Sequence, residues 1–345
     1  MNSYLLHADA DAFFASVALR DRPELAAKPV AAVAHLFIAS ANYPAREFGI
    51  HAGMLVTEAR ELCPRILLVE SYRQEVESVG DALYALFDSI ARGIEPGSIE
   101  EAFLDVGART LEEALEVAHE LRRRAATELR IPVSVGIGRT KLMAKLASRA
   151  AKPDGVHVID EARELELRTE LPIGEVWGIG ARTEARLIKL GVARIGDVDV
   201  IPRDELLRVC GTGMARRLWR IRAGTDEATI SPIRHRTTLT SESSTSGYAR
   251  ADRTPEEVLE GCVERVCHRA TRAGLSATGM KLELRPLGLG PVREKYQGID
   301  SSASFEVWMP VAKKLLAASN TSELESASVT LTGLVPVEMV QPTLF

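Results

Sequence analysis

The sequence lacks the features that mark membrane-spanning, secreted and zinc-binding proteins. No apolar run reaches the roughly 18–20 residues of a membrane span, and the N-terminal stretch MNSYLLHADAD has no basic region like that of a signal peptide. Four cysteines are scattered along the chain, and the one close pair, Cys262 and Cys267, matches no standard zinc spacing. We therefore expect a cytoplasmic protein with reduced cysteines and no disulfide framework.

A Rossmann glycine fingerprint is also missing, although strand and helix patterns alternate through the first 160 residues. Apolar positions repeat every three or four residues in 74–92 and 110–129, which predicts two amphipathic helices. Short apolar runs at 3–9 and 132–138 predict strands. A chain of 345 residues is expected to form about two to four domains, and the pattern predicts a multidomain α+β fold.

The chain has no overall excess of positive charge, because its net charge is −5. Locally the balance differs: Gly138 to Lys152 contains five basic residues and no acidic one, and Arg182 to Arg222 contains ten basic and five acidic residues. The phosphates of a nucleic acid are attracted by the electrostatic field of nearby basic residues, whatever the net charge of the chain. The acidic total therefore does not exclude DNA as a partner.

Two glycine turns lie in or beside the second basic segment. Residues 171–191 predict a helix, a turn at Gly178-Ile179-Gly180 and a second helix, and residues 203–224 repeat this arrangement around Gly211-Thr212-Gly213. Tandem helix-hairpin-helix units present backbone N–H groups to a DNA phosphate, whereas plain helix turns are the alternative. Beyond a polar stretch at 229–254, the remaining residues predict a second, smaller α+β domain.

Acidic residues follow or precede two of the predicted strands. In HADADAFF, Asp9 ends an apolar strand, where an ionised carboxylate is costly unless it is paired or binds a metal. In GSIEEAFLDV, Glu100 and Glu101 stand before a strand, where a solvated surface pair is the alternative. Together the three carboxylates suit Mg²⁺, which prefers oxygen ligands and substrate phosphates.

Groups that could bind phosphate accompany these carboxylates. SANYPAREFG offers Ser40, Tyr43 and Arg46, the last two on one helical face, and Lys152 ends a predicted helix in KLASRAAKPDG. Each of these alone could equally be a solvated side chain. Their combination with three carboxylates is compatible with a nucleotide triphosphate site.

The order and spacing of five segments resemble those of the Y-family translesion DNA polymerases, especially the bacterial DNA polymerase IV (DinB) type. The segments are LLHADADAFFASV, SANYPAREFGIHAGM, SIEEAFLDV, VSVGIGRTKLMAKLASRAAKPDG and VWGIGARTEARLIKLGV. The resemblance covers about residues 4–230 strongly and the last domain only in outline. It implies a right-hand polymerase with palm, small fingers, a helix-hairpin-helix thumb and a C-terminal little finger.

The resemblance also assigns roles to residues of the site. Asp9 and Glu101 would be catalytic metal ligands for two Mg²⁺ ions, which Mn²⁺ could replace, with the main-chain carbonyl of Ala10 as a further ligand. Glu100 would be a third catalytic ligand, but it stands where the family has aspartate. Phe14 would exclude ribonucleotides, while Phe13 would pack in the core. The incoming dNTP would contact Phe14, Ser40, Tyr43, Arg46 and Lys152, and DNA would contact Gly178, Gly180 and Arg182.

The domains that the resemblance implies are as follows. The palm would be 1–10 and 75–165, the fingers 11–74, the thumb 166–232, the linker 233–240, the little finger 241–340 and a clamp-binding tail 341–345. The tail QPTLF is similar to the clamp-binding peptide of bacterial polymerases, in which Gln341 would bind at the mouth of a cleft and Leu344 and Phe345 would fill an apolar pocket.

These features lead to two hypotheses for function. The first is a monomeric, template-directed DNA polymerase for low-fidelity translesion synthesis, acting on primer-template DNA and dNTP with a sliding clamp as partner. The alternative is a polymerase-like adaptor, weak or inactive in catalysis, that binds DNA and the clamp. The departure at Glu100 motivates the second hypothesis, and a primer-extension assay discriminates between them.

Overall fold

The computed structural model describes residues 4–34, 36–70, 73–231, 237–245, 253–319, 321 and 323–339. The chain divides into two compact units. The larger comprises Met1–Ala32, Ala39–Ala52 and Ala59–Pro232, and the smaller comprises Val33–Ile38, Gly53–Glu58 and Ile233–Phe345. Within the described ranges, no helix is both long enough and apolar enough to cross a membrane.

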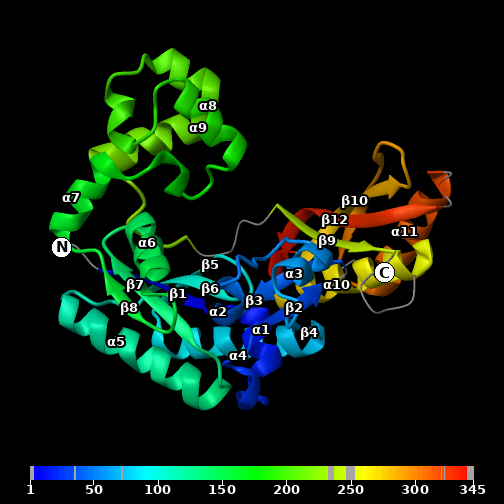
Figure 1. Ribbon diagram of the computed structural model, residues 1–345. Helices are drawn as coiled ribbons and strands as arrows, with labels where there is room; N and C mark the ends of the chain where they lie inside the picture. The colour runs from blue at the N-terminus through cyan, green and yellow to red at the C-terminus, as the bar shows by residue number, and fades with distance from the viewer. Residues whose placement is uncertain are drawn as a thin grey trace. The chain divides into compact units, whose positions relative to one another are not determined.

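A five-stranded sheet lies at the centre of the larger unit (Figure 1). Its strand order is β5-β6-β1-β7-β8. The central strand β1 pairs antiparallel with both β6 and β7, while β7 and β8 are parallel. The strands are β1 (Leu5–Ala10), β5 (Gly93–Pro96), β6 (Glu101–Asp105), β7 (Val133–Gly138) and β8 (Val156–Val158).

The sequence of β1 alternates between the two faces of this sheet. Leu6, Ala8 and Ala10 belong to the main apolar core, and successive side chains of a strand point to opposite faces. His7 and Asp9 therefore face the other side. The same alternation in β6 puts Ala102 and Leu104 in the core and leaves Glu101 on the face of Asp9.

Helices cover both faces of the sheet. Figure 1 shows α4 (Arg73–Ile90) and α5 (Leu111–Arg124) on one face and α6 (Lys141–Ala151) on the other. The predicted amphipathic helices 74–92 and 110–129 are thus confirmed, although the second changes to a π-helical turn at Ala125–Leu129. Thr110 begins α5 with a capping box, in which its hydroxyl and the Glu113 side chain satisfy each other's backbone N–H groups.

Two glycines of β7 allow α6 to lie directly on the sheet. A Cβ atom on Gly136 would lie 2.0 Å from the backbone nitrogen of Ser148, and one on Gly138 would lie 2.6 Å from that of Ala144. Any side chain at either position would therefore push the helix away. Because Gly136 pairs with His7 in the sheet, this close approach brings α6 within hydrogen-bond reach of β1.

A short segment after β1 contains three α-helices, a 3₁₀ turn and three strands. The strands form a sheet of order β3-β2-β4. The elements are α1 (Phe13–Leu19), η1 (Pro23–Leu25), β2 (Val30–Ala34), β3 (Phe37–Ala41), α2 (Tyr43–Arg46), α3 (Val56–Leu62) and β4 (Leu67–Glu70).

The helical segment that follows β8 has its own apolar core, to which Leu142, Met143 and Ala147 of α6 contribute. The predicted turn at Gly211 is confirmed, since Gly211 has a φ of 78° and breaks α9 into two helices. The predicted helix before Gly178 is instead a 3₁₀ turn, because Pro172 lacks a donor and only a few residues separate it from the glycine turn. The elements are α7 (Glu161–Glu170), η3 (Ile173–Glu175), α8 (Ala181–Lys189), η4 (Ile195–Asp199) and α9 (Arg203–Ala223).

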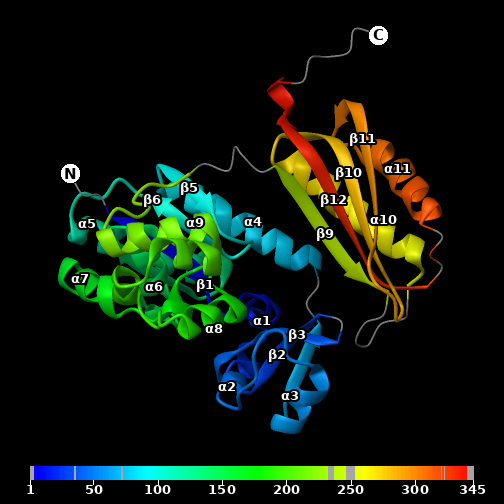
Figure 2. The ribbon, with the colours of Figure 1, turned by 90° about the horizontal axis from the view of Figure 1, so that it is seen from above.

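The smaller unit contains an antiparallel sheet of order β11-β10-β12-β9, with two helices packed on it (Figure 2). The α+β prediction for this part of the chain is confirmed. Strand β9 begins at Thr238, inside the stretch 233–240 that was expected to be a linker. The elements are β9 (Thr238–Ser244), α10 (Pro255–Arg272), β10 (Leu275–Pro286), β11 (Val292–Ser302), α11 (Phe305–Ala318), β12 (Leu324–Pro336) and η5 (Val337–Met339).

Candidate active site

Two carboxylates, Asp9 and Glu101, meet where β1 ends and β6 begins, and Glu100 directly precedes Glu101 in sequence. Asp9 and Glu101 are direct partners in the antiparallel pair of β1 and β6, and both face the side of α6. Glu100 lies one residue before β6, where its carbonyl accepts a 3.0 Å hydrogen bond from the Ala10 N–H. The two acidic motifs, about 90 residues apart in sequence, are therefore neighbours in space.

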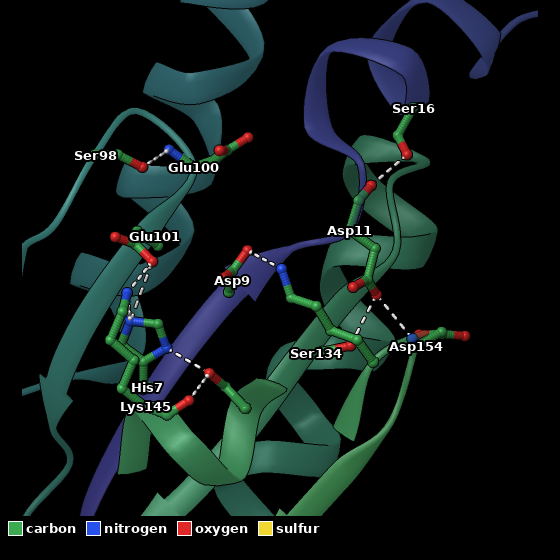
Figure 3. Close-up of polar contacts among 12 residues, drawn as sticks. His7, Asp9, Asp11, Ser16, Ser98, Glu100, Glu101, Ser134, Lys145 and Asp154 are labelled. Atoms are coloured by element: carbon green, nitrogen blue, oxygen red, sulfur yellow. Dashed lines mark hydrogen bonds and ion pairs between the residues drawn. The ribbon is translucent and has the colours of Figure 1, made fainter. Parts of the chain in front are cut away.

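Two lysines, one in α6 and one directly after it, form ion pairs with Asp9 and Glu101 (Figure 3). The Nζ atom of Lys152, which follows α6 directly, lies 2.6 Å from Oδ1 of Asp9. Two helical turns earlier, the ammonium of Lys145 forms an ion pair with Oε2 of Glu101. Both anions are thus balanced by cations from the same element.

The two glutamates have opposite electrostatics although they are adjacent in sequence. Burial raises the pKa of Glu100 to about 7, and the negative charge of Asp9 adds to this shift. Burial would also raise the pKa of Glu101, but hydrogen bonds with His7 and Lys145 outweigh it and lower that pKa to about 2. Figure 3 shows Glu101 directed towards His7 and Lys145, and Glu100 directed elsewhere.

Asp11, the second aspartate of HADADAFF, is bound by hydrogen-bond donors from neighbouring elements. Its oxygens accept hydrogen bonds from Ser134 Oγ at 2.8 Å, from the Asp154 N–H at 2.7 Å and from Tyr43 Oη at 3.1 Å. With these donors bound, Asp11 ties α2, β7 and the turn after α6 to the end of β1.

The predicted phosphate-binding residues lie in β3, in α2 and directly after α6. Ser40 is buried in β3, and Tyr43 and Arg46 are in α2, where the guanidinium stacks 4.6 Å from the tyrosine ring. Arg46 and Lys152 both lie close enough to lower the pKa of Glu100 by their positive charge. The structure therefore brings Arg46, Lys152 and the carboxylates together. Ser40 lies in β3, and no contact between Ser40 and these residues is seen in the described part of the chain.

The turn between β1 and α1 orients two aromatic residues. Ala12 has a φ of 45°, a left-handed conformation that costs energy for a residue with a Cβ atom. Phe13 is then 1% exposed in the core, as expected, whereas Phe14 is half-buried, with its ring centroid 5.8 Å from that of Phe13.

The remaining predicted contacts lie outside this cluster. Gly178 has a φ of 95°, Gly180 precedes the first residue of α8, and Arg182 is exposed in the first turn of that helix. Gln341, Leu344 and Phe345 of the tail lie outside the described residues.

Sequence reasoning missed two residues of the site, His7 and Lys145. His7 is completely buried, and its Nε2 lies 3.4 Å from Oε2 of Glu101. One signal in the sequence could have indicated both residues. His7 precedes Asp9 by two positions on a strand, and Lys145 precedes Lys152 by two helical turns, so each pair shares a face.

The donor set fits a divalent cation. Ligand atoms of His7, Asp9 and Glu101 lie within 4.8 Å of one another, and carboxylates are the ligands that Mg²⁺ prefers. The ammonium groups of Lys152 and Lys145 compensate Asp9 and Glu101, while Glu100 has a raised pKa. Each of these observations indicates a place where positive charge is favourable.

Comparisons with known proteins identify the family. The model of the impB/mucB/samB family matches residues 8–149. DNA polymerase IV of Alkalilimnicola ehrlichii is 30% identical over 344 residues, which cover 96% of each chain. The chain belongs to the Y family of DNA polymerases. Other relatives match over less of their length: 38% identity to DNA polymerase IV 2 of Mesorhizobium japonicum spans 52% of that protein, and 34% identity to DNA repair protein REV1 of Arabidopsis thaliana spans 22%.

Solved Y-family structures share the fold of the whole chain. A Y-family DNA polymerase chimera of Dbh and Dpo4 aligns with a TM-score of 0.80 at 22% identity, over 96% of this chain and 99% of that one. DinB from Sulfolobus solfataricus aligns with a TM-score of 0.70 at 22% identity, over 97% and 99%. The right-hand fold expected from the sequence is therefore confirmed.

Proposed function

We propose that the chain is a template-directed DNA polymerase for low-fidelity translesion synthesis. The observation that carries this proposal is the convergence of Asp9, Glu101 and Glu100 with the cations Lys152 and Arg46, on a chain of the Y family. Clustered carboxylates beside phosphate-binding cations suit nucleotidyl transfer, in which a primer 3′-oxygen bonds to the α-phosphorus of a dNTP and pyrophosphate leaves.

Different residues of the site would bind the metal ions and the triphosphate. Asp9, Glu100, Glu101 and the carbonyl of Ala10 would hold two Mg²⁺ ions. When bound, these ions would activate the attacking oxygen and stabilise the leaving one. Lys152 and Arg46, with Ser40 and Tyr43, would bind the triphosphate, and Lys152 would exchange Asp9 for a phosphate oxygen when the nucleotide arrives.

Selection of the sugar is proposed for Phe14, which is half-buried next to the carboxylate-bearing end of β1. Its ring would pack against the deoxyribose and exclude a 2′-hydroxyl. Incorporation of ribonucleotides should rise strongly in Phe14→Ala, whereas Phe13→Leu, a change in the core, should leave sugar selectivity unaltered. Unchanged selectivity in Phe14→Ala would place the gate elsewhere.

Primer-template DNA and a sliding clamp are the proposed partners. The N–H groups at Gly178 and Gly180 and the exposed Arg182 are suited to a DNA phosphate. The QPTLF tail is proposed to bind the clamp, which would raise the local concentration of enzyme at the primer end. Deleting residues 341–345 should weaken clamp binding and leave distributive synthesis unchanged.

Primer extension on an undamaged template, with Mg²⁺ or Mn²⁺, tests the proposal. Template-dependent incorporation by the full chain is expected. A well-folded sample that binds DNA without incorporating nucleotides would instead support the polymerase-like adaptor, for which glutamate at position 100 is the specific observation.

A further inference from the structure

A closed set of buried hydrogen bonds lies behind Glu101, on the side of α6 (Figure 3). Nδ1 of His7 lies 2.7 Å from Oγ of Ser148, and the same Oγ lies 2.9 Å from the carbonyl oxygen of Lys145. The ammonium of Lys145 lies 3.3 Å from Nε2 of His7 and forms the ion pair with Glu101. We call Ser148, His7 and Lys145 the support triad.

The hydrogen bond between His7 and Glu101 decides how the protons of the support triad are arranged. An ammonium group can only donate, and Lys145 donates to Oε2 of Glu101. Nε2 of His7, 3.4 Å from the same oxygen, can donate to it only when the imidazole hydrogen is on Nε2. Nδ1 then accepts from the Ser148 hydroxyl at 2.7 Å, so that Ser148 favours the tautomer that contacts Glu101.

The surroundings leave the support triad little freedom to rearrange. His7 and Ser148 are completely buried, and Lys145 is 8% exposed. The His7 ring packs 4.6 Å from that of Phe103, and the Lys145 ammonium lies 5.5 Å from the ring centroid of Trp177. Gly136, opposite His7, lets α6 lie directly against the sheet at the support triad.

We propose that Ser148 and His7 are positioning residues that, together with the Lys145 ammonium, fix Oε2 of Glu101 and so hold its carboxylate beside Asp9 for a divalent cation. Both polar contacts of the triad with Glu101 go to Oε2, and Oε1 takes no part in them. Groups that orient a metal ligand commonly change metal affinity or activity by about 10–100-fold when they are removed. This inference rests on the proposed function.

Two substitutions of His7 separate the contacts of its two nitrogens. The amide nitrogen of glutamine can occupy the place of Nε2 and donate to Glu101, whereas the amide of asparagine can occupy the place of Nδ1 and contact only Ser148. We expect His7→Asn to weaken divalent-cation binding about 10-fold and His7→Gln to weaken it less than about 3-fold. Ser148→Ala should weaken binding in the wild-type background. It should add little to His7→Gln, because a glutamine amide has no ring tautomers that Ser148 could select.

Binding is measured as the Mn²⁺ dissociation constant, by electron paramagnetic resonance, of the full chain on a dideoxy-terminated primer-template with the matched dNTP. In a parallel incorporation assay, the Mg²⁺ concentration for half-maximal rate should rise in the same order. The control is Val135→Ala, which removes buried apolar volume beside Ala8 without touching the support triad. It should lower the melting temperature and leave Mn²⁺ affinity unchanged.

Equal Mn²⁺ affinity in His7→Asn, His7→Gln and wild type, with incorporation by the wild type intact, would show that the triad only ties α6 to the sheet and would overturn this inference alone. Loss of affinity in Val135→Ala equal to that in His7→Asn would overturn it too. A folded wild type that neither binds Mn²⁺ nor incorporates nucleotides would overturn the proposed function and this inference together.

Discussion

Glu100 and Glu101 are consecutive in the chain but occupy contrasting environments. Glu101 begins a strand, faces α6 and is held by Lys145 and His7, so that its pKa falls to about 2. Glu100 lies in the preceding loop without a lysine of its own, and burial near Asp9 raises its pKa to about 7. Two consecutive carboxylates thus differ in how far the protein itself compensates their charge.

The largest effect is expected at the two compensated carboxylates. Asp9→Asn and Glu101→Gln keep the side-chain shape and remove a charge, so each should reduce incorporation by about 10²–10³-fold or more, while DNA binding persists. Single-nucleotide incorporation and a DNA-binding assay measure the two properties. Glu95→Gln is the matched control, because Glu95 is an ion-paired glutamate of the same sheet whose partner is Lys141. Activity within about 10-fold of wild type in Asp9→Asn would mean that the site is elsewhere.

A smaller effect is expected at Glu100, and its direction depends on the substitution. Glu100→Asp restores the family's residue and should preserve or increase the rate, whereas Glu100→Gln removes the charge and should reduce it by about 10–100-fold. The rates are compared at saturating Mg²⁺ and dNTP. If Glu100→Asp lost most of its activity, the pocket would have adapted to the longer side chain.

The smallest effects concern stability, and here the two glutamates should differ in sign. Between pH 4.5 and 7 the folded protein protonates Glu100 and the unfolded chain does not, so stability falls as pH rises through this range. Glu100→Gln should therefore increase the free energy of unfolding at pH 8 by about 1–3 kcal/mol, since one pKa unit corresponds to 1.36 kcal/mol. Near pH 4 the increase should vanish.

Glu101 should affect the free energy of unfolding in the opposite direction. Its lowered pKa stabilises the folded protein above pH 4.5, and this contribution is lost as pH falls from about 4.5 to about 2. Glu101→Gln should decrease the free energy of unfolding at pH 8 by about 1–3 kcal/mol. Denaturant unfolding in EDTA at pH 8 measures both variants, and shifts of the same sign would contradict the contrast between these residues.

Much of this site follows from local sequence patterns. An apolar strand ending in Asp9 and a turn before Glu101 place both residues at strand ends, and antiparallel pairing then makes them neighbours. The 3₁₀ turn before Gly178 was mistaken for a helix, because proline and glycine shorten a segment whose apolar spacing resembles a helical face. Which lysine meets which carboxylate could not be predicted, since Lys152 and Asp9 lie 143 residues apart. The contrast in pKa also depends on burial, which only the fold determines.

Helix α6 has one side on the sheet, where Gly136 and Gly138 admit it, and another side in the core of the following helical segment. An α-helix turns by about 100° per residue. A single inserted or deleted residue within Lys141–Ala151 would rotate Lys145 and Lys152 relative to each other, so that one of them would leave its carboxylate. This segment should therefore tolerate substitutions on its exposed positions far better than any change in its length.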